Sequence, residues 1–366
     1  RAAERPMKVF FYVQHLLGIG HLKRAATIAQ ALREVGFEVT LASGGAPVEG
    51  IPVLQLPPLA SDASFRKLLD EGGQPIDEAW KARRRDYLLE AYRKSRADAL
   101  IVELFPFGRR QMRFELIPLL EEARSRLVVC SARDILQPKY EREEEALEHF
   151  QRHFDRLLVH GDPRVATFER SFSRARRLEG SLHYTGYVVQ EPAAGAADAG
   201  AGEVLVSVGG GAVGRRLVET AIRARPLTGL GNRTWRILAG VNAREVETLR
   251  VDGVIVERTR SDFVQRLRNC VLSVSQAGYN TVVETLQARA RAVFVPFAGS
   301  REIEQTLRAR LLAERGLVSM VEEEALSPAT LAAAIDRAAA APRPLAGAVD
   351  LGGARQSAEL VRAWLA

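Results

Sequence analysis

The chain has 366 residues, of which 47% are hydrophobic and 27% charged, and its formal net charge is +7. This composition predicts a soluble globular protein of about two domains and excludes a disordered, collagen-like or disulfide-stapled chain. No apolar run approaches the roughly 20 residues that a membrane-spanning helix needs. The 52 Lys and Arg against 45 Asp and Glu are spread over both halves, which disfavours a nucleic-acid-binding face.

Cysteine and histidine usage predicts neither a disulfide nor a metal site. Cys130 and Cys270 lie far apart in the sequence, each in or beside an apolar run, which is typical of free buried thiols in a reducing compartment. The six histidines have no shared spacing that suggests metal ligands. We therefore expect a cytoplasmic protein without a metal ion or other cofactor.

The first half of the chain alternates short apolar runs with helical patterns. Residues 9–13 predict a buried strand, a glycine turn follows, and residues 21–35 have apolar side chains at helical spacing. Segment 61–96 is polar, helical and rich in arginine, and is expected to leave the sheet. The other predicted strands of this half are 37–41, 51–56, 99–104, 127–131 and 157–160. Strands separated by helices favour a parallel sheet covered on both faces.

The composition changes at residues 189–202, a run of Ala, Gly and Pro with single acids, which predicts an interdomain linker. The same plan then restarts with a strand at 204–208, a glycine turn and a helix at 215–225. Further strands are expected at 234–238, 253–256, 271–274 and 292–295, and a short amphipathic helix at 354–365.

These patterns predict an α/β protein with two Rossmann-like domains that face each other across a cleft. The expected boundaries are 1–188 for the first domain, 189–202 for the linker and 203–353 for the second domain. The last segment, 354–366, is a helix for which packing back on the first domain is one option.

The first motif of interest is Gly18-Ile19-Gly20-His21, between the first strand and the first helix. Glycines there allow close backbone approach, and a helix N-terminus suits an anion. Lys23 stands where the dinucleotide fingerprint has its third glycine, and the second strand ends without an acidic residue, so a nicotinamide enzyme is disfavoured. The alternative is a tight turn with a solvated histidine.

The second domain begins with a similar glycine-rich motif, Gly209-Gly210-Gly211, which follows a predicted strand. Three glycines leave room for a phosphate against the following helix. No Lys-Ser or Lys-Thr pair follows, which excludes a P-loop of the Walker type.

Two further motifs lie near the ends of later strands. Gly278, Asn280, Thr281 and Glu284 span a predicted strand-to-helix junction, where backbone and hydroxyl groups suit phosphate and a carboxylate suits a vicinal diol. The alternative is a capped helix with a surface Glu. Glu304-Gln305 begins a later helix and is able to bind sugar hydroxyls.

In this order and spacing the four elements resemble the nucleotide-sugar glycosyltransferases of the GT-B fold, and most closely the MurG-like family 28. The resemblance covers nearly the whole chain, strongly from Val204 to Val321 and weakly from Ser61 to Asp155. Within that family the chain looks most like predicted, poorly characterised bacterial glycosyltransferases.

The resemblance implies a role for each motif. Gly18 and Gly20 form the N-terminal glycine-rich loop, and His21 lies near the reacting centre. Gly209, Gly210 and Gly211 contact the donor diphosphate, although a Ser common in that loop is absent here. The remaining implied donor-binding residues are Arg260 at the nucleobase, Gly278, Asn280 and Thr281 near the phosphates, Glu284 on the ribose, and Glu304 and Gln305 on the sugar. Glu304 replaces a Gln of the family pattern, which leaves the donor sugar open.

The function that follows is a metal-independent, inverting transfer of a sugar, most readily from a UDP-sugar, to an unidentified hydroxyl acceptor. No Asp-x-Asp motif is present to hold a divalent ion. His21 is the first candidate for the general base, and Glu103 and Asp134 near strand ends are the second candidates. His15 is a weaker rival because it precedes the glycine turn.

Two alternative functions stay open: a nucleotide-sugar hydrolase or 2-epimerase on the same fold, and a non-catalytic nucleotide-sugar-binding protein. The expected partners are a nucleotide-sugar donor and an acceptor, with a lipid-linked acceptor and peripheral contact with the inner membrane face as options, and no nucleic acid. The acceptor-side loops match the family least, so the sequence does not identify the acceptor.

Overall fold

The structure is a computed structural model of the whole chain. It describes residues 5–16, 18–62, 67–137, 140–193, 195–208, 214–240, 251–299 and 303–366. Its contacts divide the chain into two compact units. Unit 1 comprises Arg1–Pro163, Thr167–Gln190 and Gly352–Ala366, and unit 2 comprises Arg164–Ala166 and Glu191–Leu351.

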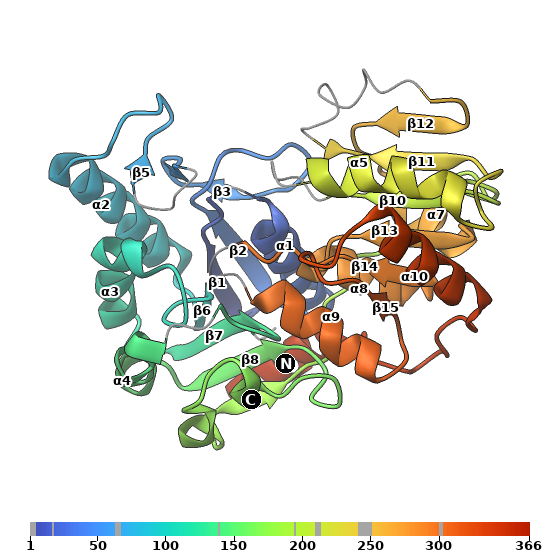
Figure 1. Cartoon of the computed structure of the whole chain (residues 1–366). Helices are drawn as coiled ribbons and strands as arrows, with labels where there is room; N and C mark the ends of the chain where they lie inside the picture. The colour runs from blue at the N-terminus through green and yellow to red at the C-terminus, as the bar shows by residue number, and fades with distance from the viewer. Residues whose placement is uncertain are drawn as a thin grey trace. The chain divides into compact units, whose positions relative to one another are not determined.

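Unit 1 is built on a parallel seven-stranded sheet of order β3-β2-β1-β6-β7-β8-β9 (Figure 1). A separate antiparallel pair joins β4 (Ala60–Ser61) to β5 (Leu68–Leu69). The strands of the main sheet are β1 (Lys8–Val13), β2 (Glu38–Ser43), β3 (Leu54–Gln55), β6 (Ala99–Glu103), β7 (Leu127–Arg133), β8 (Arg156–His160) and β9 (Leu182–Tyr184).

Alternate residues of the β1 strand face two different cores, because successive side chains of a strand point to opposite faces. Phe10 and Tyr12 pack with α2 (Glu78–Ser95), α3 (Arg113–Glu122) and α4 (Glu143–His153). Val9 and Phe11 pack instead with α1 (Gly20–Glu34) and α11 (Gly353–Leu365). The sheet therefore has helices on both faces, and its strands β1 and β6 are apolar apart from Lys8 and Glu103 at their ends.

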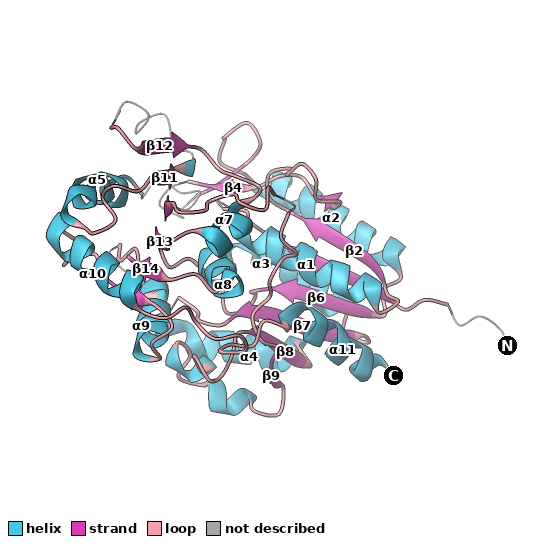
Figure 2. Cartoon of the chain, turned by 90° about the vertical axis from the view of Figure 1, so that its right-hand side faces the viewer, coloured by secondary structure: helices cyan, strands magenta, loops and turns pink. Residues whose placement is uncertain are grey.

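The C-terminal helix α11 belongs to unit 1, where it packs against α1 (Figure 2). The chain returns there beside the segment that leaves the unit, since Val188 and Gly352 form an antiparallel bridge. A Cβ at Gly353 would lie 2.4 Å from the carbonyl oxygen of Gly186, so only glycine permits this close approach.

Unit 2 repeats the plan with a parallel six-stranded sheet of order β12-β11-β10-β13-β14-β15. Its strands are β10 (Val204–Ser207), β11 (Trp235–Leu238), β12 (Val254–Glu257), β13 (Leu272–Ser275), β14 (Ala292–Phe294) and β15 (Ser319–Met320). Among the described residues, its helices of seven residues or more are α5 (Arg215–Ala224), α7 (Phe263–Asn269), α8 (Tyr279–Ala288), α9 (Glu304–Glu314) and α10 (Pro328–Ala340). Helices α5 and α10 cover one face of this sheet, and α7 and α8 contribute to the other.

The α/β prediction and its two parallel sheets are confirmed, and every predicted strand appears. The segment expected as a strand at 51–56 pairs over only two residues, Leu54 and Gln55. Four short strands were not predicted, the edge strands β9 and β15 and the pair β4 and β5, because two or three residues leave no periodic signal. Segment 61–96, expected to be helical, is a helix only from Glu78 to Ser95. Among the described residues no helix is long and apolar enough to cross a bilayer.

Candidate active site

In unit 1 the strand order reverses between β1 and β6, the point at which open α/β sheets bind ligands beyond the carboxyl ends of their strands. Two of the four predicted general-base candidates meet there. Glu103 is the last residue of β6, and His21 is the second residue of α1, which follows β1. The fold itself thus brings together side chains 82 positions apart in the sequence.

His21, Glu103 and Arg24 form a compact polar group. His21 Nδ1 lies 2.9 Å from Glu103 Oε1, and Arg24 donates to the same carboxylate oxygen. The Glu103 side chain is fully buried, whereas 17% of the His21 side chain is exposed. The carboxylate is thus held inside the protein, and the imidazole is the member of the group that a ligand is able to reach.

The protonation states of this group follow from burial and charge. Burial, together with the cations of Arg109 and Arg24, lowers the pKa of His21 to about 3, although Glu103 opposes that shift. Burial alone would raise the pKa of Glu103, but the positive charges around it hold that pKa below its usual range. At neutral pH the ionised Glu103 accepts the Nδ1 proton, which leaves the lone pair of His21 on Nε2.

Arg109 contacts the same region and ends a segment whose backbone is strained. Its Nε donates to the backbone oxygen of Gln14 at 2.8 Å, and its charge acts on both His21 and Glu103. Leu104 and Arg109 both have positive φ, 68° and 58°, in a stretch of six residues. Left-handed backbone at non-glycine residues costs free energy and often accompanies functional loops.

The other two base candidates are buried. Asp134 is 0% exposed and packs against Gly161, where a Cβ would lie 2.5 Å from the Asp134 Cβ. His15 is 4% exposed, its Nε2 lies 3.1 Å from the Ala46 oxygen, and burial lowers its pKa. Among these candidates His21 has the most accessible side chain, 17% of which is exposed.

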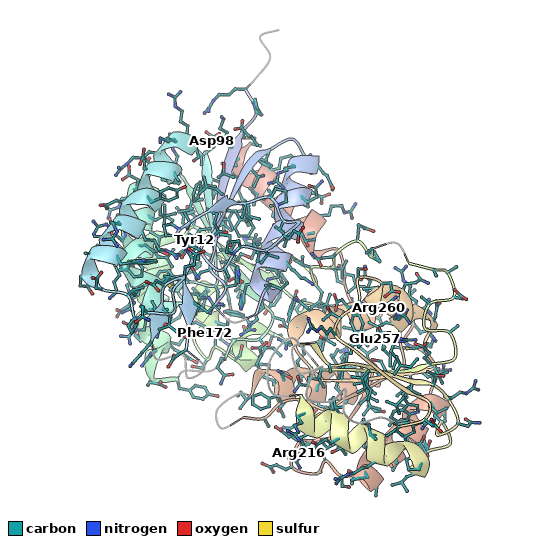
Figure 3. The ribbon with its side chains drawn as sticks, turned by 90° about the horizontal axis from the view of Figure 1, so that it is seen from above. Tyr12, Asp98, Phe172, Arg216, Glu257 and Arg260 are labelled. Carbon is teal, nitrogen blue, oxygen red and sulfur yellow. The ribbon has the colours of Figure 1, made fainter. Side chains whose placement is uncertain are left out.

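A fully buried network lies behind the loop that follows β1. Arg84 donates through Nε to Glu115 Oε2 at 2.7 Å and through Nη2 to Gln14 Oε1 at 2.6 Å. The Tyr12 hydroxyl donates to the same Glu115 carboxylate (Figure 3 labels Tyr12). All four side chains are inaccessible to solvent. Since Gln14 Nε2 donates onward to the His15 oxygen at 2.8 Å, the network fixes the backbone that leads toward His21.

In unit 2 the predicted donor-binding residues gather at the start of α8. Gly278 is the N-cap residue with φ −63°, an ordinary conformation, and a Cβ there would meet nothing within 4 Å. The backbone conformation at this position therefore does not require glycine, and the missing side chain leaves open space beside the start of α8. The backbone N–H groups of Asn280 and Thr281 have no hydrogen-bond partner among the described residues. Glu284 follows in the second turn, half-buried.

Gln305 connects this helix start with the end of β14. Its Oε1 accepts hydrogen bonds from the backbone N–H groups of Ala277 and Phe297, both at 3.1 Å. Two N–H donors fix the amide orientation, so Nε2 points away from both. That nitrogen makes no hydrogen bond within the described part of the chain, and it remains able to donate to a ligand.

Glu304 has a different environment from its neighbour. It is 3% exposed and accepts a hydrogen bond from Arg308 Nη2 at 2.8 Å, while Arg308 Nη1 donates to the Ala277 oxygen at 3.1 Å. The Glu in place of Gln is thus engaged in a buried ion pair that supports the α8 junction. This geometry favours Gln305 over Glu304 as a group that contacts a sugar.

Arg260 belongs to a closed ring of six charged side chains. In ring order these are Glu203, Arg236, Glu257, Arg260, Asp262 and Arg266. Arg260 donates to both oxygens of Asp262, at 3.0 and 3.1 Å, and these bonds, with Arg266, lower the pKa of Asp262 to about 2 (Figure 3 labels Arg260 and Glu257). The guanidinium is therefore engaged in ion pairs, and 39% of the Arg260 side chain is exposed.

Three predicted positions, Gly209, Gly210 and Gly211, lie outside the described residues. Gly18 and Gly20 are described; a Cβ at Gly18 would meet nothing within 4 Å, and Gly20 opens α1. Within the described ranges no three His, Cys, Asp or Glu side chains gather as a metal-ligand set.

Sequence reasoning did not single out Arg24 or the Arg84–Glu115 pair. The sequence could have indicated that Arg24 is buried, because it lies four residues before Ile28 and therefore on the buried face of α1. Arg84 and Glu115 sit on two helices 31 residues apart, and no local pattern links them.

Comparison with known proteins bears on the fold and on the second unit. Residues 205–348 match the model of the glycosyltransferase family 28 C-terminal domain. A UDP-N-acetylglucosamine–N-acetylmuramyl-(pentapeptide) pyrophosphoryl-undecaprenol N-acetylglucosamine transferase of Ralstonia nicotianae is 30% identical over 141 residues, which are 36% of this chain and 38% of that protein. The match thus spans little more than a third of this curated relative.

Solved structures match over the whole length. The calicheamicin glycosyltransferase CalG4 superposes with a TM-score of 0.67 at 15% identity, covering 99% of this chain and 98% of that one. MurG of Acinetobacter baumannii gives a TM-score of 0.61 at 14% identity, covering 98% and 100%. The chain therefore has the GT-B fold of glycosyltransferases, with two Rossmann-like domains. Its similarity to glycosyltransferase family 28 lies in residues 205–348, within the second unit.

Proposed function

We propose that this protein transfers a sugar from a UDP-sugar to the hydroxyl group of an acceptor, by a metal-independent reaction that inverts the anomeric centre. The observation that carries the proposal is the His21–Glu103 pair, a neutral imidazole whose tautomer is set by a buried carboxylate. The UDP part rests on the name of the Ralstonia relative, and the acceptor stays unidentified.

In the proposed reaction the acceptor hydroxyl gives its proton to His21 Nε2 while its oxygen attacks the anomeric carbon of the donor. The bond from that carbon to the diphosphate breaks, and the nucleoside diphosphate leaves with the electron pair. Attack from the face opposite the leaving group inverts the configuration. Glu103 and Arg24 do not touch the substrate: Glu103 orients the ring and stabilises the imidazolium that forms.

The donor site is proposed at the start of α8, where unpaired backbone N–H groups and the positive end of the helix dipole favour the leaving diphosphate. Such groups stabilise developing negative charge without a divalent ion. Glu284 is assigned to the ribose hydroxyls, Gln305 Nε2 to the donor sugar, and the Arg260 backbone to the nucleobase.

The test is an assay of nucleoside diphosphate release from UDP-, GDP- and dTDP-sugars with a panel of hydroxyl acceptors. We expect release from a UDP-sugar that depends on the acceptor, persists in excess EDTA and yields a product of opposite anomeric configuration by NMR. A product of retained configuration, or release abolished by EDTA, would contradict the mechanism.

A further inference from the structure

Unit 2 has a basic surface at the edge of its sheet where the strands begin, which is opposite to the edge that holds the start of α8. Arg268 lies in the last turn of α7, Arg289 is the C-cap residue of α8, and Arg291 directly precedes β14. The segment that follows α10 adds Arg343 and Leu345. We call these five residues the arginine–leucine patch.

Hydrogen bonds place the segment after α10 against the other parts of the patch. Each bond runs from an arginine side chain to a backbone oxygen and has a length of 2.6–2.8 Å. The bonds run from Arg343 to Arg268 and Cys270, from Arg289 to Pro344, and from Arg291 to Ala341. Three separate stretches of the chain therefore meet on one surface.

Acids do not neutralise the charge of the patch. None of its four arginines forms an ion pair with a carboxylate among the residues that the structure describes. Helices α7, α8 and α10 end at this edge, and a helix C-terminus carries roughly half a negative charge, so the three together offset only about 1.5 positive charges. In the segment 341–350 the single acid is Asp350. The patch therefore keeps a positive charge that an anionic partner is able to offset.

The apolar member of the patch protrudes into solvent. Leu345 is 76% exposed and begins a turn in which the Ala348 N–H donates to the Leu345 oxygen at 3.3 Å. A single exposed leucine is ordinary on a protein surface. Here it directly follows Pro344, to which Arg289 donates, so the apolar side chain stands beside guanidinium groups. It is this combination, and not the leucine alone, that indicates a partner.

The chemistry of the patch fits a lipid bilayer better than a macromolecule in solution. Guanidinium groups bind phosphate, and an exposed leucine gains by leaving water at the boundary between headgroups and acyl chains. A stable protein interface buries about 800 Å² per partner around an apolar core, which one leucine does not supply. A site for single-stranded nucleic acid presents aromatic side chains on which bases stack, and the patch has none.

From these observations we infer that the arginine–leucine patch docks unit 2 on a bilayer that contains anionic phospholipids, with its guanidinium groups at lipid phosphates and Leu345 inserted among the headgroups. This contact does not depend on the proposed transfer reaction. It also involves none of the residues assigned to the donor or to the general base.

The test is co-sedimentation of the full-length protein with two kinds of vesicle, phosphatidylcholine alone and an equimolar mixture of phosphatidylcholine and phosphatidylglycerol. We expect binding to the anionic vesicles that weakens as the NaCl concentration rises, because salt screens exposed charges, and little binding to the neutral vesicles. Equal binding to both kinds, or no binding to the anionic vesicles, would overturn the inference.

Two variants separate the charge from the apolar contact. Arg268→Gln combined with Arg289→Gln removes two charges, each worth about fivefold in binding to an anionic surface, so we expect binding to weaken at least about tenfold. Leu345→Ser keeps every charge and should weaken binding about fivefold or more, since the inserted side chain is lost. Wild-type binding by either variant, with the fold intact by circular dichroism, would contradict the inference.

A matched control tests whether the patch, and not the overall charge of +7, attracts the vesicles. Arg33→Gln combined with Arg83→Gln removes two exposed arginines of unit 1 and changes the net charge by the same amount. This control should bind the anionic vesicles as the wild type does. Weakening equal to that of the patch variant would mean that the attraction is general, and would remove the patch from the account.

The rival partner is nucleic acid, and a single-stranded DNA oligonucleotide tests it by fluorescence anisotropy. Tighter binding of the oligonucleotide than of the anionic vesicles, lost in the double arginine variant but kept in Leu345→Ser, would overturn the inference. The same samples are titrated with UDP-N-acetylglucosamine in a thermal-shift assay, in which the patch variants should respond as the wild type does. Absence of donor binding with vesicle binding intact refutes the transferase proposal alone.

Discussion

At the scale of single residues, catalysis is proposed to depend on one partly exposed imidazole among buried charges. His21 is the reachable member of its group, and Glu103 and Arg24 are enclosed behind it. A carboxylate that accepts from Nδ1 keeps Nε2 free of a proton, which is the state that a general base needs. If His21 is the general base, two results are expected that a histidine with only a structural role would not give.

The first concerns removal of the imidazole. We expect His21→Ala to lower kcat by about 10²- to 10⁴-fold, the usual contribution of a positioned general base, with the affinity for the nucleotide sugar unchanged. Steady-state kinetics and a donor titration measure both quantities. His15→Ala is the control at the rival histidine, and full turnover of His21→Ala would remove His21 from the mechanism.

The second prediction concerns pH. His21 acts as a base only when neutral, and its pKa is lowered to about 3, so the active form persists well below the ordinary histidine value of about 6.5. We expect kcat/KM to stay level as pH falls from 8 to 5, provided the fold is intact by circular dichroism. An acidic limb with a midpoint near 6.5 would show instead that the imidazole titrates as an exposed group does.

At the scale of secondary-structure elements, buried charge networks hold the loops that carry the site. Arg84 on α2 and Glu115 on α3 fix Gln14 at the end of β1, and the ring around Asp262 holds the segment between β12 and α7. We propose a positioning role for the second network in addition to its effect on stability, because it includes Arg260, whose backbone is assigned to the nucleobase.

Removal of Arg84 tests the first network. Arg84→Met leaves the fully buried Glu115 carboxylate without its cation, so we expect the free energy of unfolding to fall by about 3–5 kcal/mol. Arg83→Met, at the exposed neighbouring position of the same helix, should change it by less than about 0.5 kcal/mol. Urea denaturation followed by circular dichroism compares the two, and equal losses would mean that Arg84 is not part of a stabilising network.

Elements were more predictable from the sequence than contacts between them. Apolar runs such as 99–104 indicate their strands because a buried parallel strand has no polar face. The order β3-β2-β1-β6 brings Glu103 beside the loop of His21, but nothing local to either residue specifies that pairing. The hydrogen bond between His21 and Glu103 is a consequence of the sheet topology, and so is the Arg84 network. Neither could therefore be predicted from the sequence alone.

In the molecule as a whole, the two sheets share one strand order over six strands, and unit 1 adds a seventh strand, β9. Unit 1 carries the proposed base, and unit 2 carries the family 28 match and the proposed diphosphate site. The repeated strand, turn and helix on either side of residues 189–202 predicted this division of the sequence. We propose that both units take part in each turnover.

The most direct measurement of the central claim is a thermal-shift titration of the intact protein with UDP-N-acetylglucosamine, beside GDP-, dTDP- and CMP-sugars. A ligand that binds only the folded state stabilises it by mass action, so at 100 times its Kd the gain is about 2.7 kcal/mol. The account predicts a melting temperature that rises with the concentration of the UDP-sugar and is equally raised in His21→Ala. No rise with any nucleotide sugar at millimolar concentration would contradict it.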